Sequence, residues 1–100
     1  MHNRPGKRTP LGNAKNQSIS SVTTLAALAA ATTPSSATAV YAQIQAVDGA
    51  LYLVTDASTP SSTNYGRKLT DGETYDVTEA NANWGDIKLI GTSVSIMFSS

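Results

Sequence analysis

TAVYAQIQAVDGALYLVTD, residues 38–56, carries the clearest structural pattern in the chain. Residues 40–47 alternate between two faces, and residues 50–56 do so again, which is typical of β-strands with one face in a core. Asp48-Gly49 is a dipeptide favoured in two-residue hairpin turns, because both central residues there need positive φ. The stretch predicts a hairpin. Its inward residues are Val40, Ala42, Ile44 and Ala46, then Leu51 and Leu53.

The C-terminal part of the chain repeats this pattern. We expect a short strand at residues 67–69, a turn at Asp71-Gly72 and a strand at residues 73–78. Residues 86–90 and 93–98 predict a second hairpin, turned at Gly91-Thr92. Its core residues are Ile87, Leu89, Val94, Ile96 and Phe98, and the outward residues of its last strand are Ser93, Ser95, Met97 and Ser99.

Two loops separate these strands. Residues 57–66, ASTPSSTNYG, favour turns over strand pairing, and a loop of ten residues in so small a domain is either mobile or used for contact. The second loop, residues 79–85, contains the only tryptophan. The sequence therefore suggests Asn64, Tyr65 and Trp84 as loop residues that contact a partner.

The N-terminal segment has a different composition. Residues 1–17, MHNRPGKRTPLGNAKNQ, include two Pro and two Gly and offer no periodic apolar face. They predict an extended basic arm in front of a single β domain at residues 18–100, best defined over residues 38–100. The arm's expected partner contacts are its four basic residues, Arg4, Lys7, Arg8 and Lys15.

The apolar run Leu25–Ala31 has seven residues, whereas a membrane span needs about 20. Its Thr- and Ser-rich flanks also disfavour a signal peptide. One or two turns of helix, ending before Pro34, and a strand at residues 18–25 are both compatible with this region.

Composition limits the chemistry. The 100 residues allow one small domain; there is no Cys, and the only His is at position 2. Thiol catalysis, disulfides, Cys/His metal clusters and Ser-His-Asp arrangements are thereby excluded, and we expect no enzyme activity, cofactor or metal. Residues 1–47 contain four basic and no acidic residues, whereas residues 48–100 contain three basic and seven acidic ones. Such halves could attract each other, which hints at assembly.

Carboxylates suggest two alternative chemistries. Asp71, Glu73 and Asp76, or Asp48 and Asp56, could donate oxygens to Ca²⁺, but the spacing is not that of an EF-hand loop. Glu73 and Asp76 could be a glycosidase pair, yet no second acid at a predictable cross-site distance can be identified. Neither set is a strong motif.

Aromatic and basic residues suggest two further binding functions. Trp84 with Tyr41, Tyr52 and Tyr65 could stack against sugars or bases, although a core or interface Trp is the commoner role. The four charges of the arm have no interleaved aromatics, so they predict at most weak, salt-sensitive nucleic-acid binding.

Strands at short spacing, joined by tight turns, predict an all-β fold, a small antiparallel β-sandwich or barrel-like domain with an extended N-terminal arm. A domain of this size is marginally stable without a disulfide or metal, so we expect oligomerisation.

Six stretches resemble small β-sandwich structural proteins of tailed bacteriophages. They are YAQIQA (41–46), LYLVTD (51–56), Pro60, GRKLTDGET (66–74), DIKLI (86–90) and VSIMF (94–98). The resemblance covers about residues 38–100, and the basic arm lies outside it.

The resemblance implies a non-enzymatic virion protein, and foremost a capsid decoration or cement protein that binds and stabilises the phage head through its arm and β domain. The implied partners are the major capsid protein or other virion proteins, with a homotrimer on the head surface and no membrane. A neck, tail or fibre-attachment component is the alternative, and a carbohydrate-binding module is a separate class.

Overall fold

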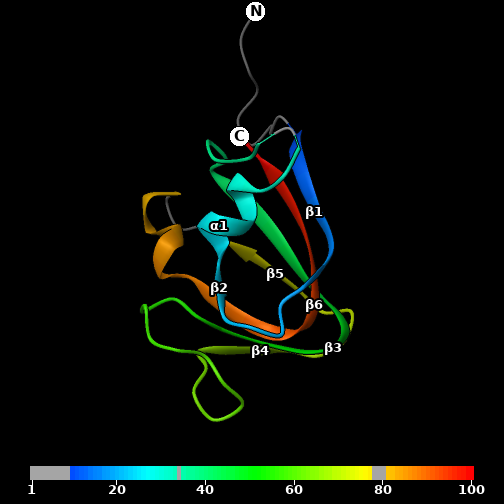
Figure 1. Cartoon of the computed structure of the whole chain (residues 1–100), viewed down its shortest axis with the longest axis vertical. Coiled ribbons are helices and arrows are strands. Elements are labelled where there is room, and N and C mark those ends of the chain that lie inside the picture. Colours follow the sequence, from blue (N-terminus) through cyan, green and yellow to red (C-terminus); the bar gives the residue numbers. More distant parts are fainter. Residues whose placement is uncertain (1–9, 34, 78–80) are drawn as a thin grey trace, which may run out of the picture.

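Two long antiparallel strands organise the fold, as the computed structural model of the chain shows (Figure 1). The structure describes residues 10–33, 35–77 and 81–100. The elements are β1 (Pro10–Ser18), β2 (Thr23–Thr24), α1 (Leu25–Ala30), β3 (Tyr41–Val54), β4 (Arg67–Leu69), β5 (Thr74–Val77), the 3-10 helix η1 (Asn81–Asp86) and β6 (Lys88–Ser99). The predicted all-β class, with antiparallel pairing, is confirmed.

β3 and β6 pair along their whole length, from Tyr41 opposite Ser99 to Val54 opposite Lys88. The first half of β3 has β5 beside it, and the second half has β4. On the other side, β1 lies beside the C-terminal half of β6 and β2 beside its start. β3 and β6 are therefore shared by two four-stranded halves of the sheet, one with β1 and β5 and the other with β2 and β4. The bend in β3 and β6 folds the sheet around a core (Figure 1).

Both predicted hairpins are wrong. The chain does not reverse at Asp48-Gly49 or at Gly91-Thr92; each long strand bends there and continues. Asp48 and Gly49 do have positive φ, +60° and +144°, but in an irregularity where the register of β3 on β6 shifts. Such a bulge shifts the alternation of buried and exposed residues by one position, and a two-residue hairpin turn shifts it in the same way. The alternation in the sequence is therefore compatible with either structure.

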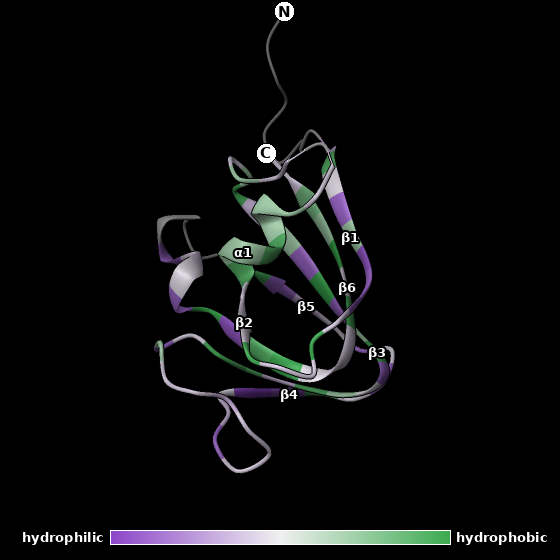
Figure 2. Cartoon of the chain, viewed as in Figure 1, coloured by the Kyte–Doolittle hydropathy of each residue, from purple (hydrophilic) through white to green (hydrophobic). Residues whose placement is uncertain are grey.

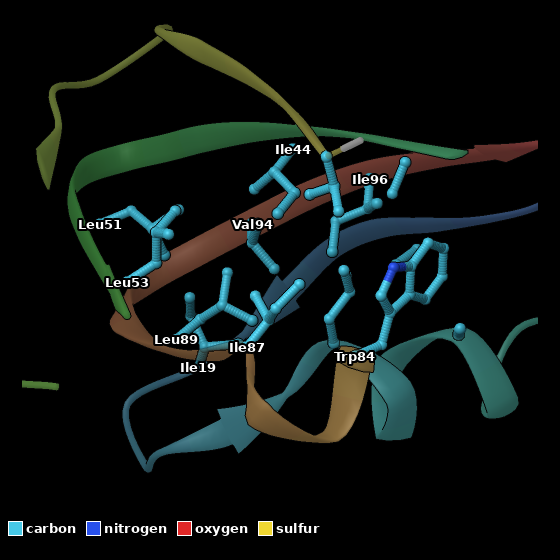
Figure 3. Packing of buried hydrophobic residues seen from close by; sticks show 14 of the residues in the cluster. Ile19, Ile44, Leu51, Leu53, Trp84, Ile87, Leu89, Val94 and Ile96 are labelled. Atoms are coloured by element: carbon cyan, nitrogen blue, oxygen red, sulfur yellow. The ribbon is translucent and has the colours of Figure 1, made fainter. Parts of the chain in front are cut away.

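The inward residues are mostly as predicted (Figure 3). Those confirmed as buried are Ala42, Ile44, Ala46, Leu51, Leu53, Ile87, Leu89, Val94, Ile96 and Phe98. Val40 is an exception, 58% exposed, because it precedes the paired part of β3. Ser99 was expected to face outward but is buried, because it pairs with both Pro10 and Tyr41 between two strands.

The middle of the chain follows its predicted pattern. β4 and β5 fall where short strands were expected, and the turn between them has Gly72 at φ +86°. The Glu73 carboxylate closes this turn by accepting hydrogen bonds from the Thr70 N–H (2.7 Å) and hydroxyl (2.8 Å). These two bonds hold the pKa of Glu73 below its ordinary value, because they favour the charged form.

The apolar run forms the expected helix, and of the strand considered at residues 18–25 the structure has the two-residue β2 at Thr23–Thr24. α1 begins after Thr24, whose hydroxyl oxygen accepts a hydrogen bond from the Ala27 N–H at 3.1 Å. Leu25 and Ala29 of this helix are buried, and the helix is apolar along its length (Figure 2). α1 and η1 contact each other and close the core on the side opposite the central strands (Figure 3).

The predicted boundary of the N-terminal arm is wrong. Residues 10–17 form most of β1 and pair with β6 in the same chain, with Ala14 opposite Ile96 and buried. The pairing with β6 satisfies backbone groups, so this stretch needs few apolar side chains to join the domain. Residues 1–9 lie outside the described residues. They carry three basic groups, and residues 10–100 carry four basic against seven acidic ones, a net charge of −3.

Candidate partner-binding surface

The loop of residues 57–66 projects from the sheet between β3 and β4 (Figure 1). Its base is tied to the chain just before β6, where the Ala57 N–H donates to the Asp86 carbonyl at 3.1 Å. The Lys88 ammonium donates to the Ala57 carbonyl at 2.9 Å. Because Ala57 itself has φ +67°, this entry into the loop is held in an uncommon backbone conformation by its surroundings. The loop has a fixed base.

Asp56 adds a second brace at the same end. Its carboxylate oxygen accepts hydrogen bonds from the N–H and the hydroxyl of Ser58, at 3.1 and 2.6 Å. These bonds lower the pKa of Asp56 from its ordinary value, the hydroxyl bond contributing most. The carboxylate therefore acts as a turn-forming group here.

The tip of the loop is closed by its own polar groups. Ser61 and Asn64 exchange two backbone hydrogen bonds, at 2.8 and 3.2 Å. The Asn64 side-chain amide donates to the Thr59 carbonyl at 2.7 Å, and Pro60 is buried. Asn64, predicted as a partner contact, is exposed but uses this side chain to brace the loop.

Tyr65 is the aromatic group that this loop presents. It is 46% exposed, and its ring lies 5.3 Å from the ring of Tyr52 on β3, tilted by 43°. The Lys68 ammonium lies 5.9 Å from the Tyr52 ring, and the Arg67 guanidinium lies 5.5 Å from the ring of Tyr75 on β5. The structure thus brings the exposed Tyr65 together with the half-buried Tyr52 and with Lys68, whereas Arg67, the neighbour of Lys68 on β4, contacts Tyr75. We name Tyr52, Tyr65 and Lys68 the tyrosine patch.

Trp84 does not belong to this surface. Its side chain is fully buried (Figure 3). Its ring lies 5.8 Å from the ring of Phe98. The expectation that Trp84 contacts a partner is wrong, because η1 turns it into the core where a loop was predicted. Tyr41 is half-buried at the opposite end of β3, so the stacking surface of four aromatics does not form.

Of the four basic residues that were predicted to contact a partner, the structure describes only Lys15. Lys15 is exposed on β1, which stands at one end of the strand order, whereas β4 stands at the other end. Arg4, Lys7 and Arg8 lie outside the described residues. Their positive charge is known from the sequence alone.

A groove that the sequence did not predict lies near the start of β1. It has a volume of about 310 Å³, and Leu11, Tyr41 and Met97 are among the residues that line it. Met97 is 56% exposed, as its outward position in the alternation predicted. The pairing of β1 with β6 creates this groove, and that pairing had no signal in the local sequence.

The described residues contain no group of three or more His, Cys, Asp or Glu side chains placed to hold a metal ion. Asp48 and Asp71 do come together, since the Asp48 N–H donates to the Asp71 carboxylate at 3.0 Å. In the same ranges, no helix is both long and apolar enough to cross a membrane. Comparison of the chain with protein-family models, with curated proteins and with solved structures found no match.

Proposed function

We propose that this chain is a structural, non-enzymatic protein of a phage particle, in the first place a capsid decoration protein that docks through its tyrosine patch. The observation that carries the proposal is the braced loop, which presents Tyr65 beside Tyr52 and the Lys68 ammonium. The resemblance of residues 38–100 to phage β-sandwich proteins supplies the kind of partner, the major capsid protein or another virion protein.

A braced loop favours binding because less conformational entropy is lost when it docks. Its hydrogen bonds run from Asp56 at the base to Asn64 at the tip. Tyrosine provides a large contact area with few rotatable bonds, and short hydroxyl and amide side chains provide adaptable polar contacts. Residues 57–66 combine these residue types, so Tyr65 is the expected anchor of the contact.

The basic N-terminal residues form the second part of the proposal. Arg4, Lys7 and Arg8 give residues 1–9 a charge of +3. Arginine pairs with carboxylates through two parallel hydrogen bonds, so an acidic surface on the particle or on a neighbouring copy suits this segment. A homo-oligomer on the head surface belongs to the same proposal, and the resemblance implies three copies.

Two alternatives use the same patch. A neck, tail or fibre-attachment protein would need the same anchoring contact at another place on the particle. A carbohydrate-binding module is favoured by the exposed Tyr65 ring beside the half-buried Tyr52, because aromatic faces stack on sugars. Soluble glycans that compete with particle binding would support the module.

Cosedimentation with particles of the encoding phage that lack this protein tests the proposal. Tyr65→Ala should weaken binding at least about tenfold, as expected for a central aromatic anchor. Val40→Ala is the matched control, since Val40 is an exposed apolar residue bonded to Ser99 at the other end of β3. Wild-type binding by Tyr65→Ala, or no binding by the unaltered chain, would contradict the proposal.

A further inference from the structure

A groove runs over the outer face of the sheet where β1, β6, β3 and β5 lie side by side (Figure 1). The hollow of about 310 Å³ near the start of β1 is one part of it. A second hollow, of about 370 Å³, adjoins the first, because Asn13, Gln43 and Met97 line both. Each has the volume of a small-molecule site, about 300–1,000 Å³. We name the two hollows together the amide groove, after the polar side chains that line it, among them Asn13, Lys15, Gln43, Gln45, Thr74 and Ser95.

The strand register sets the floor of this groove. Asn13 on β1 and Gln43 on β3 both lie opposite Met97 of β6. Met97 is 56% exposed and offers an apolar, adaptable surface between two amide side chains. Backbone groups inside a sheet are paired between strands, so a ligand on this face meets side chains only.

Two glutamine side chains are held in place before any ligand binds. The Gln43 Nε2 donates to the Asp76 carboxylate at 3.1 Å, and the Gln45 Nε2 donates to the Gly72 carbonyl at 3.2 Å. These bonds hold each amide in one orientation and leave its Oε1 as a hydrogen-bond acceptor. Acceptors that are already oriented bind a donor at a smaller cost in conformational entropy. The groove therefore suits a ligand with several hydroxyl groups.

Charge favours a ligand that is also acidic. Lys15 is exposed, and among the described residues that line the amide groove it is the only charged one. Pro10 lines the groove as well, and three basic residues precede it in the chain. Asp76 lies on the other side, on β5 beyond Gln43. An acidic group is therefore attracted to the β1 side of the groove and repelled from the β5 side.

We propose that the amide groove binds a linear oligosaccharide that contains uronic acid units. The carboxylate of one unit pairs with the Lys15 ammonium, hydroxyl groups donate to the Oε1 atoms of Gln43 and Gln45, and the C–H face of a ring packs on Met97. A uronic acid combines these three kinds of group in one unit. No residue of the tyrosine patch lines the groove, so this inference does not rest on the proposed virion function.

The groove suits two other acidic polymers less well. An extended peptide binds mainly through backbone hydrogen bonds at the edge of a sheet, whereas the amide groove lies on a face. Nucleic acids bind through several cations and exposed aromatic rings. Among the described lining residues Lys15 is the only cation, and the Tyr41 side chain is half-buried.

Isothermal titration calorimetry of the full-length chain tests this site, with oligomers of galacturonic, glucuronic and mannuronic acid as probes. At least one oligomer should bind, and Lys15→Gln should weaken its binding at least about tenfold, because a charge-assisted hydrogen bond is lost. The methyl ester of that oligomer should bind the unaltered chain and Lys15→Gln equally, since it has no charge to pair. Lys68→Gln is the matched control, an exposed lysine outside the groove, and should bind the acid as the unaltered chain does.

Gln45→Met gives a second readout, which does not depend on charge. It keeps the length of the side chain but removes the acceptor, and should weaken the acid and the ester alike, by about two- to tenfold. Tyr65→Ala should bind the acid normally, which separates this groove from sugar stacking at the tyrosine patch. The proposal is overturned if none of the three oligomers binds, if Lys15→Gln binds the acid as well as the unaltered chain, or if poly-glutamate or oligothymidylate binds as tightly.

Discussion

Met97 and Phe98 are neighbours on β6 whose side chains meet opposite environments. Met97 is 56% exposed, whereas Phe98 is 2% exposed and packs against Trp84. Phe98→Ala should therefore lower the free energy of unfolding by about 3–5 kcal/mol, through lost burial and the cavity left behind. Met97→Ser should change it by less than about 1 kcal/mol.

Urea unfolding followed by circular dichroism measures both variants. Since small domains have only about 5–15 kcal/mol of stability, Phe98→Ala should unfold at a much lower urea concentration than the unaltered chain. Equal losses from the two variants would contradict the register of β6 against its neighbours.

β3 and β6 approach each other closely at their bends. A Cβ atom on Gly91 would lie 2.5 Å from the Ala50 carbonyl oxygen and 3.1 Å from the Leu51 Cα, and both neighbours are backbone atoms that cannot move aside cheaply. The two strands can bend together only because β6 has no side chain at this position. Glycine is required here by the close approach.

Gly91→Ala should therefore destabilise the protein by about 1–3 kcal/mol or more, because the strands must separate at the bend. Gly85→Ala is the matched control, since a Cβ there meets no atom within 4 Å and should cost little. Thermal denaturation of both variants checks the expectation. A Gly91→Ala protein as stable as Gly85→Ala would contradict the paired bends and favour a turn at this glycine.

The first described residue, Pro10, is also the first residue of β1. Deleting residues 1–9 should leave the circular dichroism spectrum and the melting temperature nearly unchanged, while weakening particle binding through the loss of three charges. Deleting residues 1–17 should unfold the domain, because it removes most of β1 together with buried Ala14. If the shorter deletion binds particles as well as the full chain, these nine residues have no docking role.

The amino-acid sequence was sufficient for the β class, for most core positions and for the loop that presents Tyr65. Alternation of apolar and polar residues has a period of two, which depends only on strand geometry and is therefore visible locally. The side-chain neighbours of Tyr65 could not be predicted from this alternation. Lys68 lies opposite Tyr52 only because β4 pairs with the second half of β3.

Tertiary structure decided three further features: the bends in place of hairpins, the inclusion of residues 10–17 in the sheet, and the burial of Trp84. A two-residue turn and a bulge shift the alternation equally, so the pairing of β3 with β6 chooses between them. Ala14 and Trp84 are buried by partners far away in the sequence, β6 for the first and Phe98 for the second. Pairing and packing between distant segments supply the free energy that selects these conformations, and no local stretch of the chain contains it.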